Sequence, residues 1–320
     1  MSAPEGGQVS QAVVVAKELL TDRVIRVTLA RPDHGRLPDW TPGAHIDLHL
    51  ENGLVRQYSL CGDRWDTQKY QIAVLRETDG KGGSLFVHDS LDVGDIVEIG
   101  GPRNNFPLYS ADDYIFIAGG IGITPLLPMI AAAERLKLPW KLVYTGRTRD
   151  SISFVDELAD YGDRVVIHPR DELGRHDLDA TLAQRQSGTL VYACGPAKLL
   201  DDLHEKARSW SNPNALHTEL FQAAPLAAPA RSTGFQVRLD RRGALIDVGP
   251  DETVLEALRG AGAHILSSCG VGTCGTCEVG VLDGVPDHRD SILSEGDRQA
   301  NDCMFVCVSR ALSDTLVVDL

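Results

Sequence analysis

The chain has 320 residues, of which 43% are hydrophobic and 24% charged, and its net charge is −14. This length exceeds one ordinary domain, so we expect two or three domains, each with its own core. The negative charge argues against nucleic acid as a partner, because phosphates repel an acidic surface. No apolar run reaches the ~20 residues of a membrane span and no secretory leader is evident, so we expect no membrane partner and a cytoplasmic location.

The first hundred residues read as short strands separated by turns. Apolar and polar residues alternate with a period of two, and turn pairs such as Asn52-Gly53 separate the stretches. The alternating stretches are 24–29, 45–50, 70–75 and 95–99. This pattern predicts an antiparallel barrel or sandwich.

Two short motifs in this region carry possible chemistry. Arg56-Gln57-Tyr58-Ser59 places a cation, an aromatic ring and a hydroxyl on neighbouring positions of one strand. Gly82-Gly83-Ser84 precedes a short stretch that predicts a helix. Such a start predicts a phosphate cradle, because free N–H groups and the helix dipole converge there.

Together with a cysteine run near the C-terminus, these motifs resemble the flavin-binding barrel of the ferredoxin–NADP reductase superfamily. The resemblance implies that Arg56 contacts the flavin phosphate or ribityl chain, that Tyr58 packs on the isoalloxazine ring, and that Ser59 bonds near its N5 atom. The implied phosphate contacts are Gly82, Gly83 and Ser84. Residues 101–108 are also similar to the segment that closes this barrel.

The middle of the chain predicts a nucleotide-binding α/β domain. Residues 114–118 are continuously apolar, as in a buried parallel strand. A glycine-rich turn, 119–125, and a helical stretch, 126–136, follow, which is the arrangement of a pyrophosphate site. The turn departs from the GxGxxG fingerprint, and no acid closes the next strand near 143–145, which disfavours a standard Rossmann dehydrogenase. Alternating strands and helices up to residue 207 predict a doubly wound sheet.

The glycine-rich turn resembles the G-G-x-G-x-T-P motif in the nicotinamide half of the same superfamily. The dinucleotide contacts implied there are Gly119, Gly120, Gly122 and Thr124. Cys194-Gly195-Pro196 resembles the family's C-G-P, which implies that Cys194 lies beside the nicotinamide with Thr124 nearby. We assign Cys194 a positioning role in hydride transfer and not a nucleophilic one. By itself, a cysteine in this context is ordinarily a small buried hydrophobe.

Two further residues are candidates for the dinucleotide and flavin sites. Arg147 follows a predicted strand at its carboxyl end, where such sheets bind ligands. In the family pattern this arginine contacts the dinucleotide, whereas the alternative is a solvated loop arginine. The resemblance also implies that Phe221 packs against the nicotinamide-facing side of the flavin, and a plain core position is the alternative.

An Ala- and Pro-rich segment, 222–232, has no periodic apolar face and predicts a linker. Beyond it, residues 235–239 and 243–248 alternate like a hairpin, and 254–261 predict a helix. Strands are expected at 277–282, 304–308 and 316–320.

Residues 234–320 hold 14 acids and 7 bases, about half of the net charge. This acidic surface would steer a basic redox partner, or it serves only for solubility.

Four cysteines of this last region show the plant-type spacing of a [2Fe–2S] cluster. Four residues separate Cys269 from Cys274, two separate Cys274 from Cys277, and Cys307 follows after a further 29. Interleaved glycines suit a loop with positive φ angles around a small cluster. A zinc site and a disulfide pair are the alternatives, but zinc usually takes two separated cysteine pairs. Cys303 and Cys307 both flank the apolar stretch 304–306, so either could be the fourth ligand. The plant-type spacing favours Cys307.

The order of the parts resembles the phthalate dioxygenase reductase and vanillate O-demethylase reductase family. We expect an antiparallel β-barrel flavin domain (1–110), a doubly wound α/β nicotinamide domain (111–225), a linker (226–233) and an α+β β-grasp ferredoxin domain (234–320). The resemblance implies FMN, a [2Fe–2S] cluster and NADH as co-substrate. It implies an enzyme that passes electrons through its acidic ferredoxin domain to a terminal oxygenase of the Rieske type. We expect a monomer.

Three other functions fit parts of this pattern. The same domains serve a cytochrome P450 or another monooxygenase equally well. A non-enzymatic redox sensor would use the cluster as a switch and turn over NADH slowly. A zinc-stapled binding module would be colourless.

Overall fold

The computed structural model describes residues 9–78, 80, 82–221, 226, 228–267, 269–293 and 295–320. The chain divides into two compact units, Met1–Phe221 and Gln222–Leu320. The predicted boundary after residue 110 lies inside the first unit, and that finer division stays a prediction. Residues 1–8 of the predicted flavin domain lie outside the described residues. Residues 222–225 and 227 of the predicted linker lie outside them too.

The first unit begins with a six-stranded antiparallel sheet in the order β4-β3-β6-β1-β2-β5. Its elements are β1 (Ser10–Thr21), β2 (Val24–Ala30), β3 (His45–His49), β4 (Val55–Ser59), β5 (Lys69–Leu75), α1 (Gly83–Asp89) and β6 (Ile96–Arg103). A bridge between Leu60 and Ile72 joins the chain after β4 to β5, so the two edges of the sheet meet. This is the predicted barrel, with Ile46, Leu48 and Ile72 fully buried in its core.

A five-stranded parallel sheet follows in the order β11-β10-β7-β8-β9. Its strands are β7 (Asp113–Gly119), β8 (Trp140–Gly146), β9 (Val165–Pro169), β10 (Thr189–Cys194) and β11 (Leu216–Glu219). Its helices are α2 (Leu126–Arg135), α3 (Val155–Ala159), α4 (Arg170–Leu173), α5 (Leu178–Leu182) and α6 (Ala197–Ala207), with 3-10 turns η1 (Gly120–Ile123), η2 (Arg149–Ser151), η3 (Gly162–Arg164) and η4 (Pro213–Ala215). The chain leaves β7 toward β8 on one side and returns to β10 on the other, so the strand order reverses between β7 and β10. Open α/β sheets bind ligands at such a switch point.

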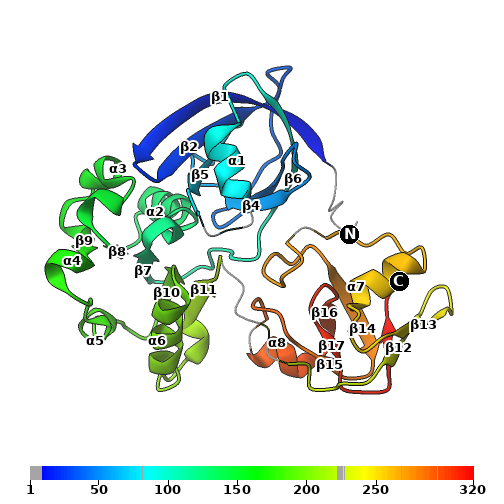
Figure 1. Cartoon of the computed structure of the whole chain (residues 1–320). Coiled ribbons are helices and arrows are strands. Elements are labelled where there is room, and N and C mark those ends of the chain that lie inside the picture. The colour runs from blue at the N-terminus through cyan, green and yellow to red at the C-terminus, as the bar shows by residue number, and fades with distance from the viewer. Residues whose placement is uncertain are drawn as a thin grey trace. The chain divides into compact units, whose positions relative to one another are not determined.

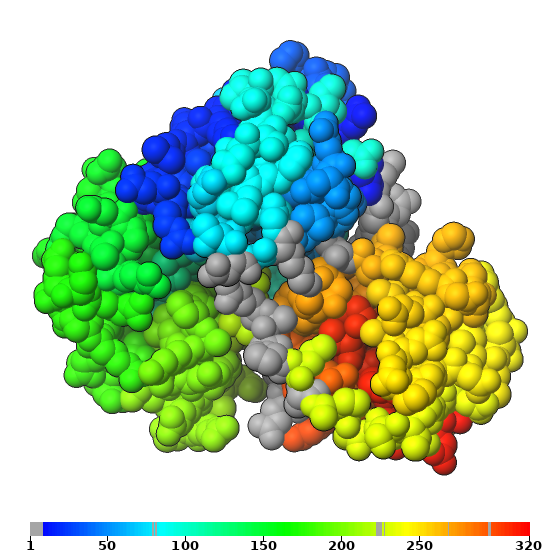
Figure 2. All heavy atoms as spheres, viewed as in Figure 1, coloured from blue at the N-terminus to red at the C-terminus, as the bar shows by residue number. Residues whose placement is uncertain are grey.

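The barrel and the parallel sheet pack against each other within the first unit (Figures 1 and 2). Arg26 of β2 forms ion pairs with Glu18 of β1 and, at 2.6 Å, with Glu157 of α3. One arginine of the barrel therefore bridges to a helix beside the parallel sheet.

The second unit is a small mixed sheet with one main helix. Its strands, in the order β13-β12-β18-β14-β16 with a separate β15-β17 pair, are β12 (Phe235–Leu239), β13 (Leu245–Val248), β14 (Glu278–Asp283), β15 (Pro286–Asp287), β16 (Cys303–Phe305), β17 (Arg310–Ala311) and β18 (Thr315–Val318). The helices are α7 (Val254–Gly260), which starts in a capping box of Thr253 and Glu256, and α8 (Glu295–Ala300). β12 runs parallel to β18 and the other pairs are antiparallel, which confirms the predicted β-grasp fold.

One predicted element of this unit is wrong in extent. The strand expected at 304–308 ends at Phe305, because the Phe305 carbonyl accepts hydrogen bonds from the N–H groups of Val308 and Ser309. The apolar residues Val306–Val308 therefore form a buried turn, and Cys307 lies in that turn instead of on a strand. Within the described residues, no helix has the length and apolar character needed to cross a membrane.

Candidate functional site

The predicted flavin motif lies on β4, the strand at one edge of the barrel sheet. Tyr58 stands opposite Ile46 and Arg56 opposite Leu48 in the register with β3, so both side chains share one face of the strand. Ser59 is buried and Tyr58 is half-buried. Burial raises the pKa of the Tyr58 hydroxyl, which keeps this ring neutral.

The second predicted flavin motif, at the start of α1, meets the first in space. The backbone of Gly82 has a φ of 80°, a left-handed conformation that favours glycine. A Cβ atom added at Gly83 would lie 2.4 Å from Nε of Arg56, so the guanidinium rests directly on this glycine. The Ser84 hydroxyl accepts a hydrogen bond from the Glu77 N–H at 3.1 Å. The structure thus brings Arg56 to the helix start that sequence analysis had predicted separately.

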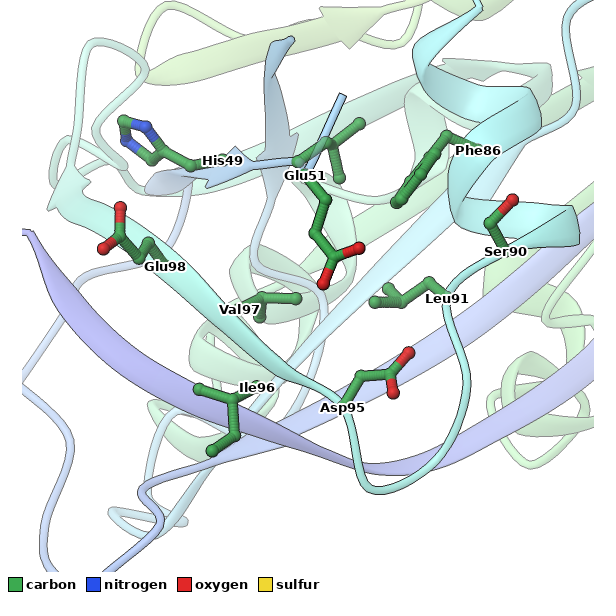
Figure 3. Close-up of a pocket in the computed structure, with 10 residues that line it drawn as sticks. His49, Glu51, Phe86, Ser90, Leu91, Asp95, Ile96, Val97 and Glu98 are labelled. Atoms are coloured by element: carbon green, nitrogen blue, oxygen red, sulfur yellow. The ribbon is translucent and has the colours of Figure 1, made fainter. Parts of the chain in front are cut away.

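A small pocket opens at the other end of α1 (Figure 3). Phe86, Leu91 and Val97 supply apolar lining, and Glu51 and Asp95 point their carboxylates toward the same space. None of the predicted cofactor residues lines it. The pocket is therefore separate from the motif at the helix N-terminus.

The predicted dinucleotide residues meet where the strand order reverses. A Cβ added at Gly122 would lie 2.2 Å from the Cys194 carbonyl oxygen, and one added at Gly119 would lie 2.6 Å from Cδ of Pro196. Cys194 stands opposite Ala118 in the register of β10 with β7, which aligns the ends of the two strands. Both glycines are thus required by close contact between two turns that lie more than 70 residues apart in the chain, with backbone at Gly122 and with the Pro196 ring at Gly119.

The two side chains predicted near the nicotinamide are both inaccessible to solvent. The Thr124 hydroxyl donates to the Ile121 carbonyl at 3.0 Å, and Cys194 is fully buried. Burial raises the pKa of the Cys194 thiol well above its ordinary value, with a smaller effect of Glu219. A neutral thiol is a poor nucleophile, which agrees with a positioning role.

Sequence analysis missed Glu219, the last residue of β11. It stands opposite Cys194 in the register of β11 with β10. Its Oε2 atom is shielded from solvent and has no hydrogen-bond partner among the described residues. Burial raises the pKa of this carboxyl to about 8. The sequence does show an acid at the end of a short strand. It does not show that this strand pairs with the strand that ends in Cys194, because that pairing is a tertiary contact.

Arg147 and Phe221 have no described contact with the turns that carry Gly122 and Cys194. Arg147 is exposed, and its carbonyl accepts from the Asp171 N–H at 3.1 Å. Its neighbour Arg149 forms an ion pair with Glu172 at 2.8 Å. Phe221 ends the first unit with 40% of its surface exposed.

The predicted cluster loop has the backbone that sequence analysis expected. Gly270, Gly272 and Gly275 have φ angles of 64°, 72° and 72°. The N–H groups of Val271 and Thr273 each lie 3.4 Å from the Cys269 sulfur. The Thr276 N–H lies 3.4 Å from the Cys274 sulfur. Backbone donors directed at the sulfurs fit the thiolates of an iron–sulfur cluster.

The four predicted ligands come together, and Cys303 does not join them. Hydrogen bonds from the Cys274 and Cys307 thiols hold the pKa of Cys269 far below its usual range, and a bond from Cys307 lowers that of Cys277. Three of the four thiols are buried, and Cys269 is half-buried. The Cys303 thiol has a pKa raised to about 11, mainly by burial. This donor set fits a cluster held by four thiolates.

The 2Fe-2S iron-sulfur cluster binding domain matches residues 237–312. The chain is 42% identical over 301 residues to phenoxybenzoate dioxygenase subunit beta of Ectopseudomonas oleovorans, with 93% of each protein covered. Phthalate dioxygenase reductase has a solved structure that is 34% identical, with a TM-score of 0.72 and 98% of each chain covered. An intact type IV self-sufficient cytochrome P450 monooxygenase is 40% identical, with a TM-score of 0.91. That match covers 98% of this chain and 41% of the P450, so this chain spans about two fifths of that protein.

Proposed function

This chain belongs to the phthalate dioxygenase reductase family, and from that premise we propose that it is the reductase component of a Rieske-type oxygenase. It is an NADH-dependent oxidoreductase with FMN and a [2Fe–2S] cluster. When bound, the flavin takes the electron pair of a hydride from NADH and releases single electrons to the cluster. One observation carries the proposal: a glycine turn packed on the Cys194 turn, suited to a dinucleotide, and four thiols that come together, suited to a cluster, occur in one chain.

We assign the flavin to strand β4 of the barrel and the start of α1. Arg56 and the start of α1 would hold the phosphate, because a guanidinium and free N–H groups converge there. The residues at that helix start are Gly82, Gly83 and Ser84. Tyr58 would pack on the ring system and Ser59 would bond to its edge. The contact between Arg56 and Gly83 supports this assignment.

We assign the dinucleotide to the switch point between β7 and β10. The turn residues that would approach the pyrophosphate are Gly119, Gly120, Gly122, Gly195 and Pro196. Thr124 and Cys194 would position the nicotinamide, and Glu219 would stand beside Cys194 at the same strand ends. Arg147 would contact the far part of the dinucleotide and Phe221 the flavin.

We assign the cluster to Cys269, Cys274, Cys277 and Cys307. The N–H groups on the loop sulfurs and the burial of the thiols support this ligand set. The acidic ferredoxin region would dock transiently on a basic patch of the oxygenase. We further propose a monomer in the cytoplasm, where thiols stay reduced.

A cytochrome P450 is the second candidate partner. The observation that favours it is the similarity of this chain, over almost its whole length, to part of a self-sufficient P450. The reductase chemistry is the same in both cases, and only the acceptor differs.

An anaerobic titration with NADH, followed by absorbance, tests the shared chemistry. We expect the flavin and iron–sulfur bands to bleach together. A colourless protein, or iron bands that stay oxidised while the flavin is reduced, would contradict the proposal. Mixing the reduced protein with a Rieske oxygenase and, separately, with a P450 then tests the partner. Electron transfer to the P450 alone would replace the Rieske assignment.

A further inference from the structure

An ion pair joins the two loops that follow β8 and β9 in the parallel sheet. Arg149 lies in η2, two residues beyond Arg147, and Glu172 lies in α4. Nε and Nη2 of Arg149 donate to the two carboxylate oxygens of Glu172 at 3.1 and 2.8 Å. The backbones of the same loops are also joined, because the Asp171 N–H donates to the Arg147 carbonyl at 3.1 Å. Two contacts therefore hold Glu172 beside the loop that carries both arginines.

This ion pair lies at the edge of the sheet to which the dinucleotide is assigned. The strand order β10-β7-β8-β9 places the two loops beside the glycine-rich turn after β7, on the side away from Cys194. Neighbouring strands are about 4.8 Å apart, so the end of β9 is roughly 10 Å from the end of β7. With the nicotinamide beside Cys194 and the pyrophosphate at the glycine-rich turn, the adenosine half extends toward β8 and β9. This placement of the dinucleotide rests on the proposed function.

The formal charges of the two loops cancel. Segments 147–151 and 170–173 carry equal numbers of bases and acids, which are Arg147, Arg149 and Arg170 against Asp150, Asp171 and Glu172. NADPH differs from NADH by a 2′-phosphate on the adenosine ribose, and such a phosphate carries a charge of about −1.5 to −2 at neutral pH. It would find no net positive charge here. The 2′-hydroxyl of NADH is neutral and can donate to a carboxylate.

The pairing with Glu172 occupies the donors that a 2′-phosphate would need. A guanidinium binds phosphate best through two parallel N–H bonds, and Arg149 already makes two such bonds to the carboxylate. The hydrogen bond from Arg149 holds the pKa of the Glu172 carboxyl below its usual range, so the carboxylate stays charged at neutral pH. A 2′-phosphate would have to displace this carboxylate and would then lie beside an unpaired negative charge.

We propose that Glu172 makes this chain selective for NADH over NADPH, because it holds Arg149 and repels a 2′-phosphate. β8 ends without the acid of a standard dinucleotide-binding fold, and the helix after β9 supplies one in its place. The side chains of Arg149 and Glu172 are 60% and 43% exposed. An ion pair this exposed contributes little to folding stability, so substitutions in it should leave the protein folded.

Two measurements on the intact holoprotein test this selectivity. Calorimetric titration with NADP⁺ and, separately, with NAD⁺ measures binding, and anaerobic stopped-flow mixing with NADPH and with NADH measures flavin reduction. The variants are Glu172→Ala and the double variant that combines Glu172→Ala with Arg149→Gln. The matched control is Asp39→Ala, which removes the carboxylate of another exposed ion pair, formed with Arg36 at 3.1 Å in the loop between β2 and β3. Unfolding temperatures confirm that each variant is folded.

We expect Glu172→Ala to bind NADP⁺ and to be reduced by NADPH about tenfold better than the wild type, because one charged hydrogen-bonding group is freed. NAD⁺ binding and reduction by NADH should change less than about threefold, since the 2′-hydroxyl is uncharged. The double variant should lose the gain, and Asp39→Ala should behave as the wild type.

Unchanged NADP⁺ binding by Glu172→Ala would overturn the proposal. A gain that persists without the Arg149 guanidinium, or that Asp39→Ala shares, would overturn it too, because the gain would then come from net charge alone. In these outcomes NADH still reduces the flavin and the proposed function stands. A wild-type flavin that NADH does not reduce would contradict the proposed function and the role of Glu172 together.

Discussion

Replacing Gly122 with alanine should separate the two turns proposed to hold the dinucleotide. The new Cβ would lie 2.2 Å from the Cys194 carbonyl oxygen and 2.7 Å from the Gly195 nitrogen. Ordinary van der Waals contact begins near 3.4 Å, so the turns must move apart by about 1 Å. Both contacts are backbone atoms in a buried region, and neither can turn aside as a flexible side chain would. Overpacking of this kind costs roughly 1–3 kcal/mol of folding stability.

The same displacement should slow hydride transfer. A misplacement of about 1 Å near a reacting centre costs on the order of 100-fold in rate. Anaerobic stopped-flow mixing with NADH measures flavin reduction directly, without any partner protein. The matched control is Gly162→Asn, since Gly162 also has a left-handed φ of 56° but no atom within 4 Å of an added Cβ. A Gly122→Ala protein with wild-type rate, NADH saturation and unfolding temperature would refute the proposed contact.

Three further substitutions test the remaining assignments. Cys307→Ser should lose the iron–sulfur absorbance and keep flavin reduction by NADH, whereas Cys303→Ser should retain both; the reverse pattern would make Cys303 the ligand. Arg56→Ala should release FMN on gel filtration because the phosphate loses its cation, and full flavin content would remove Arg56 from the site. Glu219 has a pKa raised to about 8 by burial, so the folded state holds its proton more tightly than the unfolded chain. Stability should therefore fall as the pH rises from about 4.5 to about 8 and level off at higher pH, and Glu219→Gln should flatten that part of a thermal unfolding profile. An unchanged profile in the variant would show that Glu219 ionises as an ordinary exposed acid.

The contacts that these substitutions test join residues that are distant in the sequence. Arg56 and Gly83 are 27 positions apart, and their meeting requires β4 to lie beside α1. Gly122 and Cys194 meet because β7 and β10 are neighbours in the sheet although β8 and β9 intervene in sequence. Glu219 joins them only through the pairing of β10 with β11.

The sequence by itself determined the chemistry of each local motif in this protein. Three cysteines and three glycines within nine residues predicted both the ligand type and the positive φ angles of the loop, because ligands so close in sequence leave the backbone few conformations. The alternation of apolar residues likewise predicted the barrel and the parallel sheet. Only the tertiary structure decided that Glu219 stands beside Cys194 and that Arg56 rests on Gly83. Such pairs depend on strand order and loop paths, which the packing of the whole core decides and no local pattern encodes.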